Sequence, residues 1–335
     1  MDDRDTRDRR PRSPSPRTHG SALGAAERPS SPAATQGQGP RRRAVVVGGR
    51  RTPFVKAFTH FMELDTIALG VAATRGLLAE LGLPRQTVDA VVWGGVILPS
   101  ASPNVGREIA LDLKLPPSAY ASTVSMACAS GLLAIVEAAR MVERGDADVV
   151  IAGGSDSTSN AEVKLPQRAV HALAPLAFGK PRPAAVMAAL GDLWPFHDLL
   201  PTRPRVAERT TGLLMGESAE DMARRNRISR KDQDAFAVRS HQRAAAAIAT
   251  GRFALEVVPV TPPGKSPVAE DSLVRPGTSL ESLARLRPVF ARGGTLTAGN
   301  SSPLTDGAAA TLVMSEERAR EMGFGQLTWL RDWAF

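Results

Sequence analysis

The chain has 335 residues, of which 43% are hydrophobic and 4% aromatic, and its formal net charge at pH 7 is +8. This length and hydrophobic content suit a globular protein with one large domain or two modest ones. No apolar run reaches the roughly 18 residues that a membrane-spanning helix needs, so we expect no membrane span. A single cysteine, Cys128, excludes an internal disulfide framework and favours a reducing, cytoplasmic location.

Residues 1–43 are expected to form a disordered tail. They are rich in Arg, Pro, Ser and Gly, and they bury too little apolar surface to offset the entropy of ordering. Such a basic tail can contact anionic surfaces, but a solvated extension explains the composition. We therefore expect no nucleic-acid partner.

From residue 44 the pattern alternates between strands and helices, which is the order of an α/β fold. Strands are indicated by short β-branched runs, and helices by apolar residues on one face of a 3.6-residue period. The elements expected in this part are a strand at 43–48, a helix at 67–81, a strand at 88–93 and a helix at 104–112.

Cys128 is expected to lie at or just before the N-terminus of a helix. An extended segment ends near Met126, and the apolar positions from Leu132 onward follow a helical period until Gly145. Unpaired amides at a helix start favour thiolate over thiol and can stabilise an oxyanion. Cys128 is therefore a candidate nucleophile, and the alternative is a buried cysteine that only packs.

After a buried strand expected at 148–154 the alternation breaks. Residues 162–204 mix prolines with basic residues, which indicates an excursion from the α/β pattern. Two helices then follow, and capping-box patterns predict their starts at Ser218 and Ser229. A last buried strand is expected at 308–314.

Other site chemistries have little support in the sequence. The histidines show no helical pairing and no partner cysteines, so we expect no metal site. The segment 153–157 lacks the final glycine of a serine-hydrolase turn, and no glycine-rich phosphate loop is present. The five histidines are His19, His60, His171, His197 and His241.

Several segments resemble, in order, those of the thiolases, which make or cleave β-ketoacyl-CoA thioesters. The resemblance begins with the nucleophile segment Met126-Ala-Cys-Ala-Ser-Gly131. Other matching segments are Arg51–Phe54, Ile151–Ser155, Met215–Glu220, Leu286–Pro288 and Gly299–Ala309. Three more, Asn300–Asp306, Leu330–Asp332 and Arg239–His241, resemble the β subunit of fatty-acid oxidation complexes.

The resemblance implies a mixed sheet with helices on both faces and an inserted α-rich loop domain that covers CoA. It predicts a disordered tail at 1–43, the N-terminal domain at 44–160 and 289–320, the insert at 161–288, and the start of a C-terminal domain at 321–335.

The resemblance also implies acyl transfer through an acyl-thioester on Cys128, with CoA as cosubstrate and no permanently bound cofactor. In the family a Gly-His-Pro histidine and a second cysteine move the protons, and this chain contains neither segment. We therefore expect a truncated polypeptide that is poorly active alone. The alternatives are a non-catalytic remnant that binds acyl-CoA or pairs with a homologous subunit, and a ketoacyl synthase, which these segments disfavour.

Four further residues receive roles from the resemblance. Ser282 matches a serine that contacts pantetheine, and Lys265 is a candidate phosphate contact or a solvated loop lysine. Met215 lines the tunnel or belongs to the core, and Asn300 shapes a loop near the active site. The expected partners are acyl-CoA or CoA, and either further copies of the chain or a partner subunit of a fatty-acid oxidation complex.

Overall fold

The computed structural model describes residues 42–163, 165–179, 183–193 and 207–334. The predicted tail at 1–43 lies outside the described residues except for its last two positions. Within these ranges, every helix is too short or too polar to traverse a lipid bilayer.

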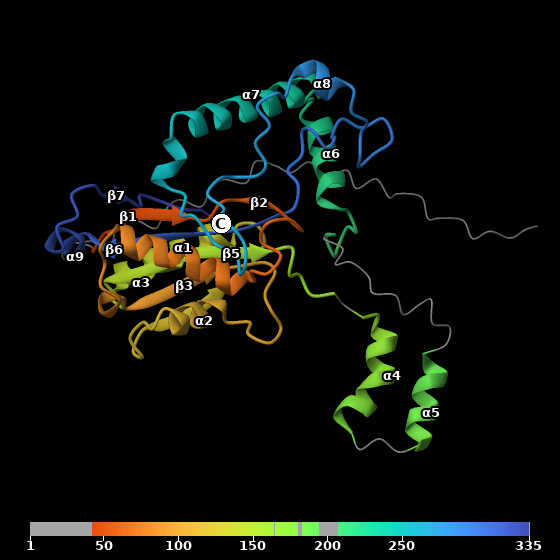
Figure 1. Ribbon diagram of the computed structural model, residues 1–335, viewed down its shortest axis with the longest axis horizontal. Coiled ribbons are helices and arrows are strands. Elements are labelled where there is room, and N and C mark those ends of the chain that lie inside the picture. The colour runs from red at the N-terminus through yellow and green to blue at the C-terminus, as the bar shows by residue number, and fades with distance from the viewer. Residues whose placement is uncertain (1–41, 164, 180–182, 194–206, 335) are drawn as a thin grey trace, which may run out of the picture. The chain divides into compact units, whose positions relative to one another are not determined.

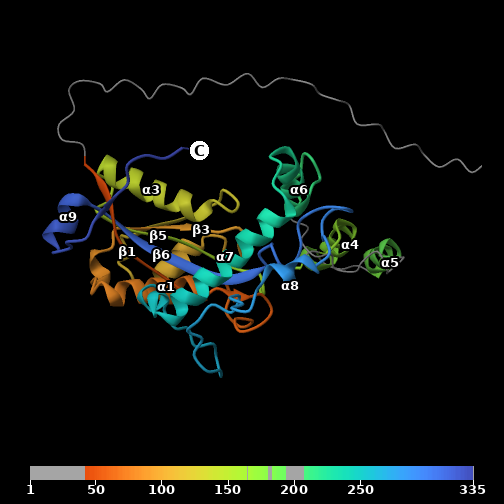
Figure 2. The same cartoon turned by 90° about the horizontal axis from the view of Figure 1, so that it is seen from above.

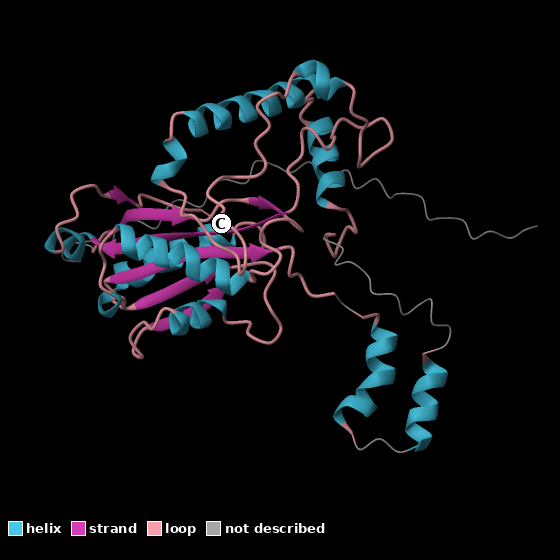
Figure 3. Cartoon of the chain, in the orientation of Figure 1, coloured by secondary structure: helices cyan, strands magenta, loops and turns pink. Residues whose placement is uncertain are grey.

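A mixed seven-stranded sheet forms the centre of the described residues (Figures 1 and 3). Its path is β4-β3-β5-β6-β1-β7, and β2 pairs with β6. Strands β3, β4 and β5 run parallel, whereas β6 is antiparallel to β5 and to β1. The strands are β1 (Ala44–Arg51), β2 (Val55–Lys56), β3 (Ala90–Gly94), β4 (Tyr120–Val124), β5 (Val149–Ser157), β6 (Thr305–Ser315) and β7 (Thr328–Trp329).

Nine α-helices accompany the sheet in the described ranges. They are α1 (Thr66–Glu80), α2 (Val105–Asp112), α3 (Ser130–Arg144), α4 (Gln167–Phe178), α5 (Pro183–Asp192), α6 (Met215–Arg225), α7 (Arg230–Ala249), α8 (Leu280–Ala284) and α9 (Glu316–Glu321). The expected helices at 67–81 and 104–112 are confirmed as α1 and α2. Helices α4 and α5 lie in the segment for which the sequence predicted only an excursion.

One predicted helix start is wrong. Helix α6 begins at Met215, so Ser218 lies inside the helix rather than at its cap. The Glu217 carboxylate accepts a hydrogen bond from the Leu214 amide at 2.7 Å, which satisfies a backbone donor at the true start. The second predicted start is confirmed, because the Ser229 side chain accepts from the Asp232 amide.

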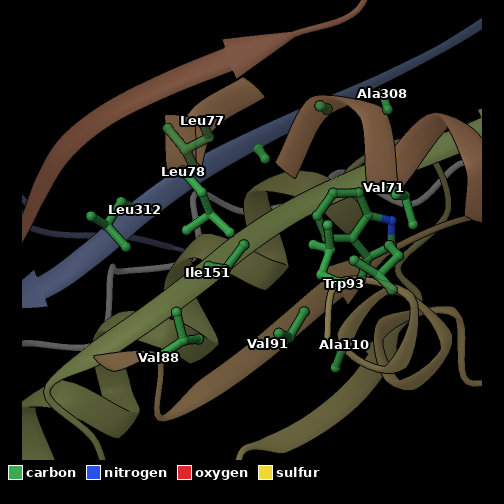
Figure 4. Packing of buried hydrophobic residues seen from close by; sticks show 14 of the residues in the cluster. Val71, Leu77, Leu78, Val88, Val91, Trp93, Ala110, Ile151, Ala308 and Leu312 are labelled. Carbon is green, nitrogen blue, oxygen red and sulfur yellow. The ribbon is translucent and has the colours of Figure 1, made fainter. Parts of the chain in front are cut away.

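Helices cover both faces of the sheet, as Figure 2 shows for α1 and α3. Alternate residues of a strand point to opposite faces, so β3 sends Trp93 to the α1 and α2 side and Val92 to the α3 side. Figure 4 shows Trp93 and Ile151 among the buried residues of the cluster on the α1 and α2 side. A sheet buried on both faces explains the continuous apolar runs of β3 and β5, and the expected architecture is confirmed.

Candidate active site

Cys128 lies in a tight turn between β4 and α3. Ala127 has φ of 46°, which is unusual for a residue with a side chain. The amides of Ala129 and Ser130 donate to the carbonyls of Met126 and Ala127, each at 3.1 Å. The Ser130 hydroxyl accepts from the Met126 amide at 2.8 Å and donates to the Ala127 carbonyl at 2.6 Å. These bonds fix the turn and leave the Cys128 side chain exposed.

The helix start next to Cys128 has no side-chain cap. Helix α3 begins at Ser130, and the residue at its cap position is Ala129, which has no side-chain acceptor. By contrast, Asp65 caps α1 by accepting from the Ala68 amide. The amides of the first turn of α3 therefore have no side-chain partner from the cap residue and can receive an anion. The predicted place of Cys128 is confirmed, and the alternative of a buried packing cysteine is wrong.

Cys128 opens into a cavity of about 290 Å³. Glycines let the chain close up around it, since a Cβ on Gly94 would lie 2.5 Å from the backbone of Ser130. The lining comprises Phe54, Gly94, Gly95, Val96, Ala127, Cys128, Ser130, Gly131, Gly154, Ser155, Asp156, Thr305, Gly307, Ala308 and Ala309. Among these lining residues, Cys128 and Asp156 carry the ionisable side chains.

Asp156 is held at the end of β5 by two backbone amides. Its Oδ1 accepts from Val96 N at 2.9 Å and from Ile97 N at 2.6 Å. Burial raises the pKa of the Asp156 carboxyl above its ordinary value, and the two amide bonds oppose that shift. The sequence analysis included Asp156 only in the segment 153–157 and gave it no role. The available signal was a carboxylate at the carboxyl end of a buried strand.

Asn300 holds the loop that begins at Gly299 to α7, and it does not line the Cys128 cavity. Its Oδ1 accepts from the Thr297 amide at 2.7 Å, and its Nδ2 donates to Asp234 Oδ1 at 3.0 Å. Asp234 is buried and also pairs with Arg230 at 2.8 Å. The loop-shaping part of the prediction for Asn300 agrees with these contacts.

A second cavity, of about 640 Å³, is lined by Asn300 together with three basic residues, Lys56, His241 and Arg275. The Arg275 amide donates to His241 Nδ1 at 3.2 Å. Burial and the charge of Arg275 lower the pKa of His241. The hydroxyl of Ser301 in the lining is buried without a hydrogen-bond partner among the described residues. This cavity suits an anionic group, and the sequence analysis gave its basic residues no role.

The residues predicted to contact CoA lie on three different segments of the chain. Met215 is the first residue of α6 and is exposed. The Ser282 hydroxyl donates to the Ser279 carbonyl at 2.8 Å within the cap of α8. Lys265 Nζ lies 3.5 Å from Glu63 Oε1. None of the three lines either of these two cavities.

The described histidines other than His241 lie outside both cavities. His60 is exposed on a loop beside Thr59, and His171 on α4 lies 2.8 Å from the Gln167 amide nitrogen. His19 and His197 lie outside the described residues. In the described part of the chain, no histidine lines the Cys128 cavity.

Comparisons with known proteins identify relatives of the whole folded region. Residues 44–317 match the family described as "Thiolase, N-terminal domain". The chain is 40% identical over 295 residues to a 3-ketoacyl-CoA thiolase of Escherichia fergusonii, a match covering 88% of the chain and 67% of the relative. A 3-ketoacyl-CoA thiolase of Aeromonas salmonicida is 41% identical over the same shares.

Solved structures give the same result. Human mitochondrial 3-ketoacyl-CoA thiolase in complex with CoA superposes with a TM-score of 0.71 and 29% identity, over 85% of this chain and 67% of that one. Bacillus anthracis acetyl-CoA acetyltransferase gives a TM-score of 0.71 and 27% identity, over 85% and 68%. The mixed sheet and the helices on its two faces thus belong to an architecture shared with these proteins, and the chain is a member of the thiolase family.

Proposed function

We propose that Cys128 takes an acyl group from an acyl-CoA thioester, as the first half of thiolase-type acyl transfer on 3-ketoacyl-CoA. The observation that carries this proposal is the exposed thiol at the uncapped start of α3, inside a cavity. A thiol packed among aliphatic side chains could not meet a thioester. The names of the relatives support the substrate class.

The chemistry follows from the groups around the thiol. The Cys128 sulfur attacks the carbonyl carbon and forms a new carbon–sulfur bond, while negative charge develops on the carbonyl oxygen. The first-turn amides of α3, among them that of the cavity-lining Gly131, are placed to stabilise that charge. With a simple acyl-CoA, the bond to the CoA sulfur then breaks, and the leaving CoA thiolate takes the proton that the Cys128 thiol lost.

With a 3-ketoacyl-CoA, the bond that breaks joins C2 to C3, and the acetyl-CoA enolate that leaves needs a proton at carbon. A positioned acid must supply it. No histidine of the described residues lines the cavity, and the chain has no second cysteine. This polypeptide is therefore equipped to take up an acyl group and poorly equipped to turn over.

We propose CoA as the cosubstrate, bound without any permanent cofactor. The basic residues of the 640 Å³ cavity support an anionic ligand there, and the human relative was solved with CoA. Ser282, Lys265 and Met215 remain proposed CoA contacts, and Asn300 is proposed to shape a loop near the active site. Low cysteine content supports a cytoplasmic location, and membership of the family supports assembly with further copies or with a partner subunit.

A second candidate function is acyl-CoA binding without transfer. The absence of a histidine from the described lining of the Cys128 cavity favours it. Mass spectrometry of the intact chain after incubation with acetyl-CoA and with longer acyl-CoAs separates the two candidates. If the acyl group is transferred, the mass of the chain should increase by that of one acyl group. The Cys128→Ala variant should show no increase. Binding without any adduct on Cys128 would overturn the proposed function.

A further inference from the structure

Asp156 introduces a carboxyl group into the cavity that holds the Cys128 thiol. The other lining residues are glycines, alanines, hydroxyl-bearing residues, Val96 and Phe54, none of which is ionised near neutral pH. Acyl transfer itself gives this carboxyl no necessary task. Its position is nevertheless built into the fold, because it joins the end of β5 to the turn that follows β3.

The carboxyl is fixed through one of its two oxygens. Oδ1 accepts both amide bonds, from Val96 and Ile97, and the described residues offer Oδ2 no hydrogen-bond donor. The same turn lies against the start of α3, close to the nucleophile in sequence, because the Gly95 carbonyl oxygen is 3.4 Å from the Ser130 hydroxyl. The negative charge of Asp156 therefore stays in place, uncompensated by any basic side chain in the cavity lining.

We propose that Asp156 is a specificity-determining residue, whose charge excludes anionic groups from the Cys128 thiol and admits neutral acyl groups. This inference rests on the proposed function, since it assigns a substrate class to the same cavity. Acyl thioesters that carry a carboxylate near the reacting carbonyl are disfavoured. Two like charges that share a cavity of this size repel, and at an effective dielectric constant of about 20 the repulsion is strong enough to change a rate about tenfold.

The exclusion depends on pH in a definite direction. Burial raises the pKa of the Asp156 carboxyl, so the group becomes neutral as the pH falls through that value, and the repulsion then disappears. Among the lining residues from β3, β5, β6 and the start of α3, Cys128 carries the other ionisable side chain. The ratio of the rates of two probes on the same protein cancels the reactivity of the thiol itself and reports the charge of Asp156.

The test compares alkylation of Cys128 by anionic iodoacetate and by neutral iodoacetamide on the 335-residue chain. The quantity measured is the iodoacetate rate divided by the iodoacetamide rate, normalised to the same ratio for N-acetylcysteine amide, a thiol that carries no carboxylate. For Cys128 we expect this normalised ratio to be about 0.1 near neutral pH. It should rise toward about 1 in acid, where Asp156 is neutral. Asp156→Asn keeps an oxygen for the two amides and removes the charge, and it should restore the ratio at all pH values. Asp112→Asn, an exposed aspartate outside this cavity, should leave the ratio low.

The unaltered chain provides a second test that needs no folded variant. Added salt screens the repulsion between Asp156 and iodoacetate. The ratio of the iodoacetate and iodoacetamide rates at Cys128 should then approach that of N-acetylcysteine amide. A ratio equal to that of the free thiol at neutral pH and low salt would refute the role of Asp156 while leaving the reactive thiol intact. Failure of both probes to modify Cys128 would overturn the proposed function itself.

Discussion

Individual side chains tie residues 253–271 to the sheet, and Arg51 at the end of β1 makes several of these contacts. Its guanidinium forms two hydrogen bonds to Asp271, at 2.7 and 2.9 Å, and also pairs with Glu256 at 3.2 Å. It also lies over the rings of Phe54 and Phe253. The pair with Asp271 is largely shielded from water, with side-chain exposures of 14% and 10%.

Arg51→Ala should lower the free energy of unfolding by about 3 kcal/mol, because it leaves the buried Asp271 carboxylate without its cation. Urea unfolding followed by circular dichroism measures this change. Arg285→Ala is the matched control, since Arg285 pairs with Glu281 in full contact with solvent, and it should change the free energy by less than about 1 kcal/mol. Equal effects of the two substitutions would contradict the role given to Arg51.

Glu220 joins α6 to the loop before Asn300, and this contact predicts a dependence of stability on pH. Burial opposes ionisation of Glu220, but the Leu296 and Thr295 amides and the Thr295 hydroxyl hold the pKa of its carboxyl below the ordinary value. A carboxyl whose pKa is lower in the folded than in the unfolded state stabilises the fold when the pH lies above the unfolded-state value. This stabilisation is lost as the pH falls through the folded-state pKa.

Glu220→Gln should therefore unfold at lower urea than the unaltered chain at about pH 7, with the difference shrinking toward about pH 3. Glu281→Gln, at an exposed position of α8, is the control and should follow the unaltered chain at both values. If the difference in stability between Glu220→Gln and the unaltered chain grew as the pH fell, the Glu220 carboxylate would not stabilise the fold in the way proposed.

At the scale of elements, the place of Cys128 depends on how closely α3 approaches β3. Gly94 at the end of β3 faces the backbone of Ser130, and Gly154 of β5 would place a Cβ 3.0 Å from the Gly94 carbonyl oxygen. Any side chain at these points pushes the helix start away from the sheet. Strands β3 and β5 must therefore keep small residues where they meet α3 below the thiol.

Gly94→Ala should destabilise the fold by roughly 1–3 kcal/mol, because the new methyl group overlaps the backbone of α3. It should also slow iodoacetamide alkylation of Cys128 by displacing the turn. Thermal unfolding and rates of alkylation measure the two effects. For stability the control is Gly131→Ala, whose Cβ meets no atom within 4 Å, and which should gain up to about 1 kcal/mol from helix propensity. Destabilisation of both variants to the same extent would argue against the steric explanation.

At the scale of the whole molecule, uptake of the acyl group and completion of the reaction require different sets of residues. The described chain provides the thiol, the amides and the cavity. It places no histidine in that cavity and contains no second cysteine. The domain boundaries predicted from the sequence, including an insert at 161–288, remain predictions.

A polypeptide of these 335 residues should release at most about one equivalent of acetyl-CoA from acetoacetyl-CoA in the presence of CoA, because the described lining of the Cys128 cavity contains no histidine and the chain has no second cysteine to move the protons. Quantification of acetyl-CoA against the acyl adduct on Cys128 tests this expectation. Cys128→Ser is the control and should yield neither a thioester adduct nor a first equivalent. Many turnovers per chain would disprove it.

Residues close together in the chain were enough to predict several of the secondary-structure elements. Helical periodicity and caps located α1, α2, α3 and α7, and the position of Cys128 before α3 followed directly. The start of α6 was missed because its cap is a Glu217 carboxylate reaching back to Leu214, whereas the expected serine lies inside the helix. Helices α4 and α5 were missed because prolines and basic residues obscured any period.

Which distant side chains share a cavity depends on how the strands are ordered in the folded chain. Asp156 and Cys128 lie on separate segments, and they meet because β4 and β5 flank β3 in parallel, which brings the carboxyl ends of the strands to one edge. Lys56, His241 and Arg275 also line one cavity although they come from three segments of the chain. Strand order and the close approach of glycines create these contacts, and neither is expressed in the spacing of residues along the chain.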